Sequence, residues 1–193
     1  PGSFLTIIGA SGSGKTTLAA RIARRTGLAH LSSDEIRKRR VGLDPLLPTP
    51  AERSGAVYQP EARRQVYEAL VRSAKTALRT GRGAIVDATF TRRADRDLVR
   101  GLAKRCGVPH VFVECTADRA TIRRRLSSRA DAAVPPTHGA RSDADWETYQ
   151  RQESDVEPVA PEEPSLRVDT EDGPLDSVLE AALMRLWDWL RLR

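Results

Sequence analysis

The segment that begins at Phe4 constrains the fold of this 193-residue chain more than any other. Residues 4–8, Phe-Leu-Thr-Ile-Ile, are apolar or β-branched, and Gly-Ala-Ser-Gly-Ser-Gly-Lys-Thr follows at positions 9–16, before an amphipathic stretch. This order of strand, glycine-rich loop and helix matches the spacing G-x-x-x-x-G-K-[ST] of a phosphate-binding loop. Because such a loop lies at the carboxyl end of a buried parallel strand, the segment predicts an α/β fold.

Each part of the loop has a chemical role. Glycine lets the backbone curl so that its N–H groups, and the amino end of the following helix, face phosphate oxygens. Lys15 adds a positive charge, and the hydroxyl of Thr16 is a ligand for Mg²⁺. We therefore expect ATP, or another nucleoside triphosphate, to bind with Mg²⁺ at Gly9, Ser11, Gly12, Ser13, Gly14, Lys15, Thr16 and Thr17.

Apolar runs alternate with amphipathic stretches along the whole chain, which is typical of helices that cross over a parallel sheet. The expected strands are residues 4–8, 28–31, 84–87, 108–115 and 166–168. The expected helices are residues 15–26, 34–40, 61–80, 93–106, 118–128, 143–153 and 175–190. Trp187 and Trp189 repeat with leucines at helical spacing and indicate a packed final helix. The pattern predicts a P-loop NTPase fold with a five-stranded, mainly parallel sheet flanked by helices.

Proline interrupts this pattern in two segments. Residues 42–60 contain four prolines, which prevent a continuous helix, and we interpret them as a loop over the acceptor side of the site. Residues 125–145 contain two prolines and a glycine after an arginine-rich helix, and we interpret them as a mobile lid. Residues 4–193 then form one kinase domain. Residues 1–3, Pro-Gly-Ser, resemble a cloning remnant, so we expect a domain cut from a longer polypeptide, with a covalently fused neighbour.

Composition limits the compartment and the partners. The two cysteines have no metal-ligand spacing, and no apolar run approaches the roughly 18 residues that span a bilayer, so we expect a cytoplasmic protein with no membrane partner. Residues 1–142 carry 27 basic and 12 acidic side chains, whereas residues 143–193 carry 5 and 14. This positive charge would attract ATP, a phosphorylated acceptor or a nucleic acid. Because nearly all of it is arginine, it also fits an arginine-rich genome.

A carboxylate follows the second expected strand, in Ser-Ser-Asp-Glu-Ile-Arg at positions 32–37. Asp34 either caps the helix that begins there or lies beside the loop at the carboxyl edge of the sheet, where it can accept the proton of an attacking hydroxyl. Beside a phosphate-binding loop we favour the catalytic role. Arg37 lies one helical turn further along the same face and is expected to hold an anionic group of the acceptor.

The third expected strand ends in Asp87-Ala88-Thr89, which brings a second carboxylate to the same edge of the sheet. Asp87 is expected to bind Mg²⁺ with Thr16, through water, or to be a second candidate base. The alternative is that Asp87 accepts hydrogen bonds from loop amides. Thr89 and Arg93, in the following loop and helix, are expected to contact the acceptor or a phosphate.

An arginine-rich helix precedes the expected lid. Arg125 and Arg129 are four residues apart and therefore share a helical face. A planar, permanently charged guanidinium suits the charge that spreads over a transferring phosphoryl group, and closure of a lid would also exclude water. The alternative is a basic helix that faces solvent.

Taken in order, the phosphate-binding loop, the S-D-x-x-R helix start, the D-A-T strand end and the R-L-x-x-R helix resemble the small P-loop kinases of the adenylate-kinase-like group. The chain looks most similar to zeta-toxin-like and polynucleotide-kinase-like ATPases, and to the AAA-type ATP-binding domain found fused to aminoglycoside-phosphotransferase-like domains. The resemblance implies that Asp34 is the general base, that Arg37 places the acceptor, and that Arg125 and Arg129 embrace the ATP phosphates. Phe90 departs from the pattern, because several relatives have asparagine there, and this departure puts the acceptor in doubt.

The sequence therefore predicts an ATP-dependent phosphotransferase whose catalytic residues are Asp34, Lys15, Arg125 and Arg129. A small-molecule acceptor is favoured over a polynucleotide 5′-hydroxyl, because 5% of the residues are aromatic and single-stranded nucleic acids are held by aromatic stacking. The alternative of another class is a nucleotide-binding regulatory module of a larger protein. A ring-forming motor ATPase is disfavoured, because the sequence has no tandem acidic Walker B signature.

Overall fold

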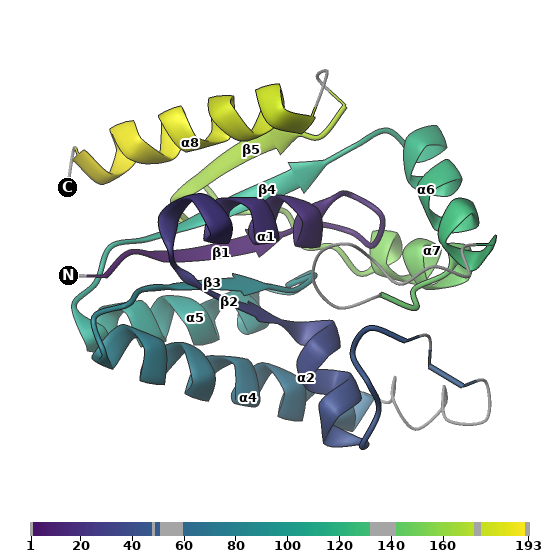
Figure 1. Ribbon diagram of the computed structural model, residues 1–193, viewed down its shortest axis with the longest axis horizontal. Coiled ribbons are helices and arrows are strands. Elements are labelled where there is room, and N and C mark those ends of the chain that lie inside the picture. The colour runs from purple at the N-terminus through teal and green to yellow at the C-terminus, as the bar shows by residue number, and fades with distance from the viewer. Residues whose placement is uncertain (1, 48, 51–59, 132–141, 172–174, 192–193) are drawn as a thin grey trace.

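A computed structural model gives the fold of the chain (Figure 1) and describes residues 2–47, 49–50, 60–131, 142–171 and 175–191. Its strands form one sheet in the order β2-β3-β1-β4-β5. They are β1 (Phe4–Ile8), β2 (Ala29–Ser32), β3 (Ala84–Asp87), β4 (His110–Thr116) and β5 (Ser165–Asp169). Each pairing in that sheet is parallel, so the sheet that was predicted as mainly parallel is parallel throughout its described strands.

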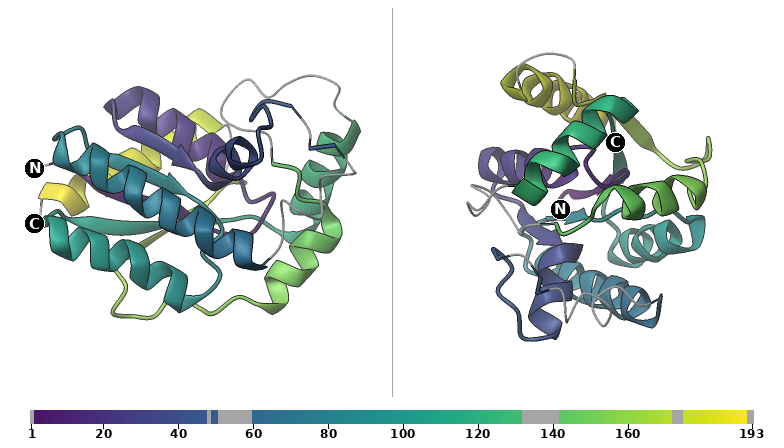
Figure 2. Two further views of the ribbon diagram at one scale, coloured as in Figure 1. Left: turned by 90° about the horizontal axis from the view of Figure 1, so that it is seen from below. Right: turned by 90° about the vertical axis from the view of Figure 1, so that its right-hand side faces the viewer.

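Helices cover both faces of the sheet (Figures 1 and 2). On one face lie α1 (Lys15–Thr26) and α8 (Leu175–Arg191), and on the other lie α4 (Pro60–Arg79) and α5 (Arg93–Cys106). Three further helices lie toward the carboxyl ends of the strands: α2 (Ser33–Arg40), α6 (Arg119–Asp131) and α7 (Trp146–Ser154). The start of β1 and the end of α8 are at the opposite end of the molecule.

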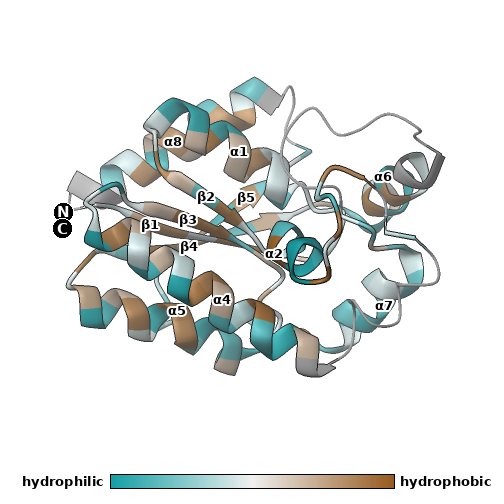
Figure 3. Cartoon of the chain, turned by 60° about the horizontal axis from the view of Figure 1, so that its bottom comes forward, coloured by the Kyte–Doolittle hydropathy of each residue, from teal (hydrophilic) through white to brown (hydrophobic). Residues whose placement is uncertain are grey.

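The alternation of side chains along the strands fills both halves of the core. In β1, Phe4 packs with Leu70 of α4 and Leu102 of α5, whereas Ile7 packs with Leu18 of α1. Every residue of β1 is buried, as expected for the central strand of a sheet covered on both faces. In Figure 3 the central strands are accordingly mostly brown, whereas the helices around them carry both brown and teal residues.

The register of the strands aligns the residues that follow them. Ile7 of β1 pairs with Asp87 of β3, and Asp87 also pairs with Ser32 of β2. Because parallel strands end at the same edge, the phosphate-binding loop after β1, the start of α2 and the end of β3 meet there. This edge carries the candidate site.

Helices α6 and α7 pack on each other beyond this edge. Tyr149 of α7 is buried with Ile122 and Leu126 of α6, and it stacks on Trp146 with a ring-centroid distance of 4.9 Å. Arg119 of α6 lies over the Trp146 ring, 5.4 Å from its centroid. These contacts form one apolar cluster, so the position of α7 depends on that of α6.

The structure corrects two sequence-based expectations. The helix predicted from residue 143 begins at Trp146, because the Asp145 carboxylate caps it and accepts a hydrogen bond from the Thr148 N–H at 2.8 Å. Trp187, expected to pack in α8, is 59% exposed. Residues 132–141 of the expected lid, and residues 48 and 51–59 of the acceptor-side loop, lie outside the described residues. Among the described helices, none is long and apolar enough to cross a membrane.

Candidate functional site

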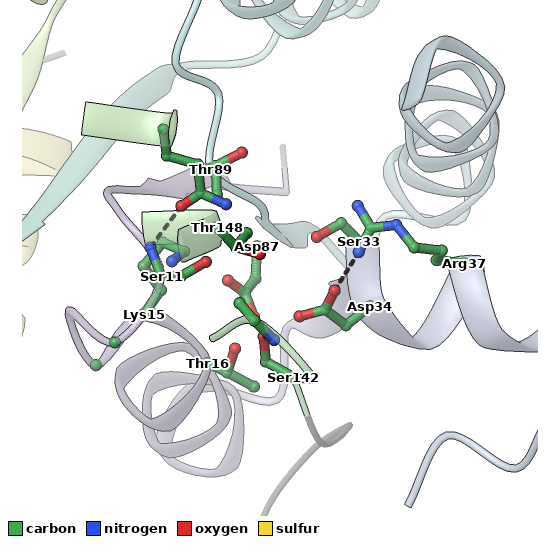
Figure 4. Close-up of a pocket in the computed structure, with 14 residues that line it drawn as sticks. Ser11, Lys15, Thr16, Ser33, Asp34, Arg37, Asp87, Thr89, Ser142 and Thr148 are labelled. Atoms are coloured by element: carbon green, nitrogen blue, oxygen red, sulfur yellow. Dashed lines mark hydrogen bonds and ion pairs between the residues drawn. The ribbon is translucent and has the colours of Figure 1, made fainter. Parts of the chain in front are cut away.

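Polar residues that are distant in sequence line one cavity of about 80 Å³ at the carboxyl edge of the sheet (Figure 4). Its walls come from the phosphate-binding loop, the start of α1, α2, the end of β3, the segment before α7, and α7 itself. The lining residues are Ser11, Gly12, Gly14, Lys15, Thr16, Ser33, Asp34, Arg37, Asp87, Thr89, Ser142, Ala144, Thr148 and Gln152. Loop residues and candidate acceptor residues therefore share one cavity, with Lys15 and Thr16 on one side of Figure 4 and Asp34 and Arg37 on the other.

The glycines of the loop are required by the backbone path. Gly9 has φ of 139°, and a Cβ at this position would lie 2.4 Å from the carbonyl oxygen of Cys115. Gly14, the residue before α1, has φ of 87°. Both values favour glycine strongly over residues with a side chain. The loop can thus curl around the amino end of α1 and turn its N–H groups toward an anion.

The two side chains at the start of α1 fit the roles expected for a phosphate-binding loop. Lys15 is 9% exposed, and its ammonium donates a hydrogen bond to the carbonyl oxygen of Ala10 at 2.7 Å, so the side chain lies folded over the loop. Thr16 lines the cavity from the same helical turn. No group of three or more His, Cys, Asp or Glu side chains suited to a metal occurs in the described parts of the chain. Thr16 and Asp87 offer one hydroxyl and one carboxylate, which suits Mg²⁺, since Mg²⁺ keeps several waters and takes further oxygens from a phosphate substrate.

Asp87 is buried at the base of the cavity. Its side chain is 2% exposed, and its Oδ2 lies 3.4 Å from Nε2 of His30, on the neighbouring strand β2. Two residues further on, the Thr89 hydroxyl lies 3.2 Å from the Tyr67 hydroxyl, and the Thr89 carbonyl accepts a hydrogen bond from the Gly9 N–H at 3.4 Å. The end of β3 is therefore tied to the phosphate-binding loop.

Asp34 faces the cavity from the first turn of α2. The N-cap of this helix is Ser32, so the alternative interpretation of Asp34 as the helix cap is wrong. The Asp34 carboxylate forms an ion pair with Arg37, one turn further on. With 19% and 16% of their side chains exposed, both remain open to the cavity, and the guanidinium holds the carboxylate in place.

A buried lysine joins α2 to the other walls. Lys38 is 1% exposed, and its ammonium donates to the carbonyl oxygen of Leu47 at 2.6 Å and lies 3.1 Å from the Asp143 carboxylate. The Thr49 N–H donates to the same carboxylate at 3.2 Å. Since Ser142 and Ala144 line the cavity on either side of Asp143, this contact holds the described part of the acceptor-side loop against the cavity wall.

Comparison with known proteins places this geometry in a family. Residues 4–159 match the family described as the AAA domain. The chain belongs to this AAA domain family. The match begins at β1 and includes every residue that lines the cavity, from Ser11 to Gln152.

This AAA domain also resembles individual proteins. An uncharacterized protein of Mycobacterium tuberculosis (strain H37Rv) is 29% identical over 154 residues, which is 76% of this chain and 31% of the relative. The chain thus spans about a third of the length of the curated relatives it matches.

Solved structures establish the fold. A sugar kinase from Janibacter sp. HTCC2649 matches with a TM-score of 0.66 and 22% identity, covering 96% of this chain and 95% of that one. The APS kinase of Mycobacterium tuberculosis, in complex with AMPPNP and APS, matches with a TM-score of 0.59 and 21% identity, covering 96% of this chain and 97% of that one. The AAA domain therefore has the fold of small P-loop kinases of the adenylate-kinase-like group.

Some predicted residues of the AAA domain lie outside the cavity. Arg93 begins α5, where its guanidinium pairs with Glu162 at 2.7 Å and its backbone N–H donates to Glu157 at 2.6 Å. Arg93 was expected to contact the acceptor, but it binds instead to the connector before β5, residues 155–164, and not to the cavity. Thr17 is not among the residues that line the cavity, while Gly9 and Ser13 line a second cavity of about 210 Å³.

Of the two arginines predicted for the lid, the structure describes the side chain of Arg125 but not that of Arg129. Arg125 donates to the carbonyl oxygen of Gly12 at 3.3 Å and to the hydroxyl and carbonyl oxygens of Thr170 at 2.8 and 3.1 Å. It therefore lies against the back of the phosphate-binding loop and does not line the cavity of about 80 Å³. The side chain of Arg129 lies outside the described residues.

Sequence reasoning missed five lining residues: Ser33, Ser142, Ala144, Thr148 and Gln152. Thr148 and Gln152 are four residues apart on α7, and this helical spacing was the only signal in the sequence that they share a face. Nothing local indicates that this face is turned toward the loop, because the packing of α7 on α6 sets its direction.

Proposed function

We propose that this AAA domain is a P-loop kinase that transfers the γ-phosphoryl group of ATP to a hydroxyl of a small molecule. The observation that carries the proposal is the shared cavity. It joins the phosphate-binding loop, with Lys15 and Thr16, to the two carboxylates Asp34 and Asp87. A domain that only sensed a nucleotide would need the loop but would not need a carboxylate positioned across from it.

In the proposed reaction, the acceptor hydroxyl attacks the γ-phosphorus. The acceptor O–H bond breaks as the O–P bond forms, and the bond between the γ-phosphorus and the β,γ-bridging oxygen breaks to release ADP. The Asp34 carboxylate takes the hydroxyl proton, and Arg37 orients that carboxylate and an anionic or polar group of the acceptor. Lys15 and the loop N–H groups hold the phosphates.

The metal ligands in this proposal are Thr16 and Asp87. Mg²⁺, when bound, neutralises charge on the β- and γ-phosphates. Asp87 is the better candidate for this role, because it is 2% exposed at the base of the cavity, whereas Asp34 lies on the α2 side, where an acceptor can enter. Arg125 is proposed to hold the loop from behind, and Arg129 to stabilise the charge on the transferring phosphoryl group.

The chemistry of the cavity favours a small acceptor. None of the described residues that line it is aromatic, so they supply no stacking surface for the bases of a single strand. The sugar kinase and the APS kinase that share the fold act, by their names, on small molecules. A sugar-like or nucleotide-like hydroxyl compound fits the hydroxyl, carboxylate and guanidinium groups on the α2 side.

The test is phosphoryl transfer from γ-labelled ATP with Mg²⁺ to a panel of sugars, nucleosides, aminoglycosides, chloramphenicol and 5′-hydroxyl oligonucleotides. Asp34→Asn should lower transfer by about 10²–10⁴-fold. Glu35→Gln is the matched control, because it removes a carboxylate from the same helical turn, one that pairs with Arg39 at 2.7 Å. We expect it to retain activity.

Each outcome decides between the alternatives. Labelled small molecule that is lost in Asp34→Asn and kept in Glu35→Gln supports the proposal. If only an oligonucleotide is labelled, the acceptor is a polynucleotide 5′-hydroxyl and not a small molecule. Label that appears only as free phosphate, at a rate that Asp34→Asn does not change, contradicts the kinase assignment and supports a nucleotide-controlled regulatory module.

A further inference from the structure

Helix α7 is hydrogen-bonded to the phosphate-binding loop by the side chain of Gln152. The Ser11 backbone N–H donates a hydrogen bond to Oε1 of Gln152 at 2.9 Å, across 141 residues of sequence. Gln152 is half-buried and lines the same cavity as Lys15 and Asp34. A loop N–H that faces the phosphate site is therefore already bonded to a protein side chain.

The chemistry of this bond determines how the amide is oriented. A backbone N–H can only donate, so the atom that accepts from Ser11 must be the amide oxygen of Gln152 and not its nitrogen. The Nε2 group, with its two N–H donors, is then the other end of an amide that lines the cavity. Gln152 thus brings neutral hydrogen-bond donors to a cavity whose other wall carries the carboxylate of Asp34.

The packing of α7 keeps this side chain in place. Tyr149, one turn before Gln152, is 6% exposed among Ile122 and Leu126 of α6, and its hydroxyl donates to the Glu153 carboxylate at 2.9 Å. Helix α6 in turn rests on the loop: a Cβ on Gly12 would lie 3.0 Å from Ile122. A donor that is held by a packed helix loses little freedom when it binds, so its hydrogen bond contributes more to affinity.

We propose that Gln152 is a γ-phosphate-binding residue: its Oε1 accepts from Ser11 while its Nε2 donates to a γ-phosphoryl oxygen of ATP. The inference rests on the proposed function and deepens it. The γ position follows from the lining of the cavity, since Asp34 and Asp87 meet the loop there and the transferring group must lie between the acceptor and the loop. Helix α7 then recognises the triphosphate, and ADP does not engage it.

The test compares the affinities for Mg²⁺-AMPPNP and Mg²⁺-ADP by calorimetry, with no acceptor present. Gln152→Glu keeps an oxygen for the Ser11 N–H, removes the donors and adds a negative charge. It should weaken AMPPNP binding by about tenfold or more, because hydrogen bonds to charged groups and nearby like charges each have effects of that size. Binding of ADP should change by less than about threefold, because no γ-phosphate is present to be repelled and the remaining charges are further away.

Two further variants separate this role from a structural one. Gln150→Glu makes the same chemical change on the same helix at an exposed position, and both affinities should stay within about twofold of wild type. Gln152→Ala removes donor and acceptor together without adding charge and should still weaken AMPPNP more than ADP. A purely structural role would lower both affinities alike.

The outcomes for the inference and for the proposed function are distinguishable. If wild type binds AMPPNP in a manner that Lys15→Ala abolishes, but both Gln152 variants keep the wild-type ratio of AMPPNP to ADP affinity, the role of Gln152 is wrong and the kinase proposal stands. If wild type does not bind AMPPNP, or binds it equally well in Lys15→Ala, the proposed function fails and the inference fails with it.

Discussion

Replacement of Arg96 by methionine tests what holds the strand edge that carries the site. Arg96 is 1% exposed in α5, and its guanidinium donates to both carboxylate oxygens of Glu163 at 2.9 and 3.0 Å. Further N–H groups donate to the carbonyl oxygens of Phe90 at 3.2 Å and of Glu157 and Pro158 at 3.0 Å. One side chain thus joins α5 to the loop after β3 and to the connector before β5.

The expected loss of stability in Arg96→Met is large because Glu163 is also buried, with 0% of its side chain exposed. Removal of one partner of a buried ion pair costs about 3–5 kcal/mol, since the other charge is left uncompensated. A domain has about 5–15 kcal/mol of total stability. For a chain of this size, 1 kcal/mol lowers the midpoint of thermal unfolding by about 2–4 °C, so Arg96→Met should lower it by about 6–20 °C.

The loss should also depend on pH. Burial acts to raise the pKa of the Glu163 carboxyl, but hydrogen bonds from Arg96 and the Ala160 N–H lower it below its ordinary value. A carboxyl whose pKa is lower in the folded state contributes stability above its unfolded pKa and loses it as the pH falls through the folded pKa. The contribution of Glu163 to the stability of wild type should therefore be lost as the pH falls below about 4.3, the ordinary pKa of a glutamate, and the advantage of wild type over Arg96→Met should narrow as Glu163 takes up its proton.

The assay is urea unfolding followed by circular dichroism at pH 7, with Arg100→Met as the matched control one turn further along α5. Arg100 pairs at 2.8 Å with Asp97, whose side chain is 52% exposed, and the loss of this pair should cost at most about 1 kcal/mol. The double variant Arg96→Met/Glu163→Leu should be more stable than Arg96→Met alone. The reasoning is refuted if Arg96→Met costs no more than Arg100→Met, or if the double variant recovers nothing.

Three further predictions follow from single contacts. Gly9→Ala should weaken AMPPNP binding at least tenfold, because its Cβ would meet the Cys115 carbonyl oxygen at 2.4 Å. The control Gly107→Ala, with open space around it, should leave binding unchanged, and equal effects of the two variants in a binding titration would contradict the prediction. Burial raises the pKa of the Cys115 thiol to about 12, so a thiol reagent at pH 8 should modify Cys106 first. Equal rates of modification of the two cysteines, measured by mass spectrometry, would contradict the burial of Cys115. Burial, with the charge of Arg100, lowers the pKa of His110 to about 3, so below about pH 6.5 only the unfolded state takes up the proton, and the free energy of unfolding should fall by about 1.4 kcal/mol per pH unit. If His110→Gln has the same dependence of stability on pH as wild type, this prediction is refuted.

Local sequence determined the elements that depend on local geometry. Helices Lys15–Thr26 and Arg93–Cys106 have the predicted bounds, because apolar periodicity and a glycine after the last turn set both the helix and its end. The phosphate-binding loop is equally local, since its glycines adopt the backbone angles that the motif requires. The meeting of Asp34 and Asp87 at one edge was predicted because buried parallel strands end together.

The order of the strands was decided only by the tertiary structure. Strand β3 lies between β2 and β1, so Asp87 is level with both Ser32 and Ile7. The sequence of β3 is apolar and equally suited to other positions in the sheet. This order places Asp87 beside the phosphate-binding loop, as its predicted role as a metal ligand requires.

Tertiary packing also decides that Gln152 lies at the site and that Arg93 does not. Arg93 follows a strand that ends at the site and carries a charge, yet α5 turns it toward Glu162 and away from the cavity. Gln152 has no local signal of function, yet packing of α7 on α6 brings it within 2.9 Å of Ser11. Local sequence determines backbone conformation, because its causes lie within a few residues. The direction of a helical face is determined by apolar contacts between distant segments, and only the folded chain contains them.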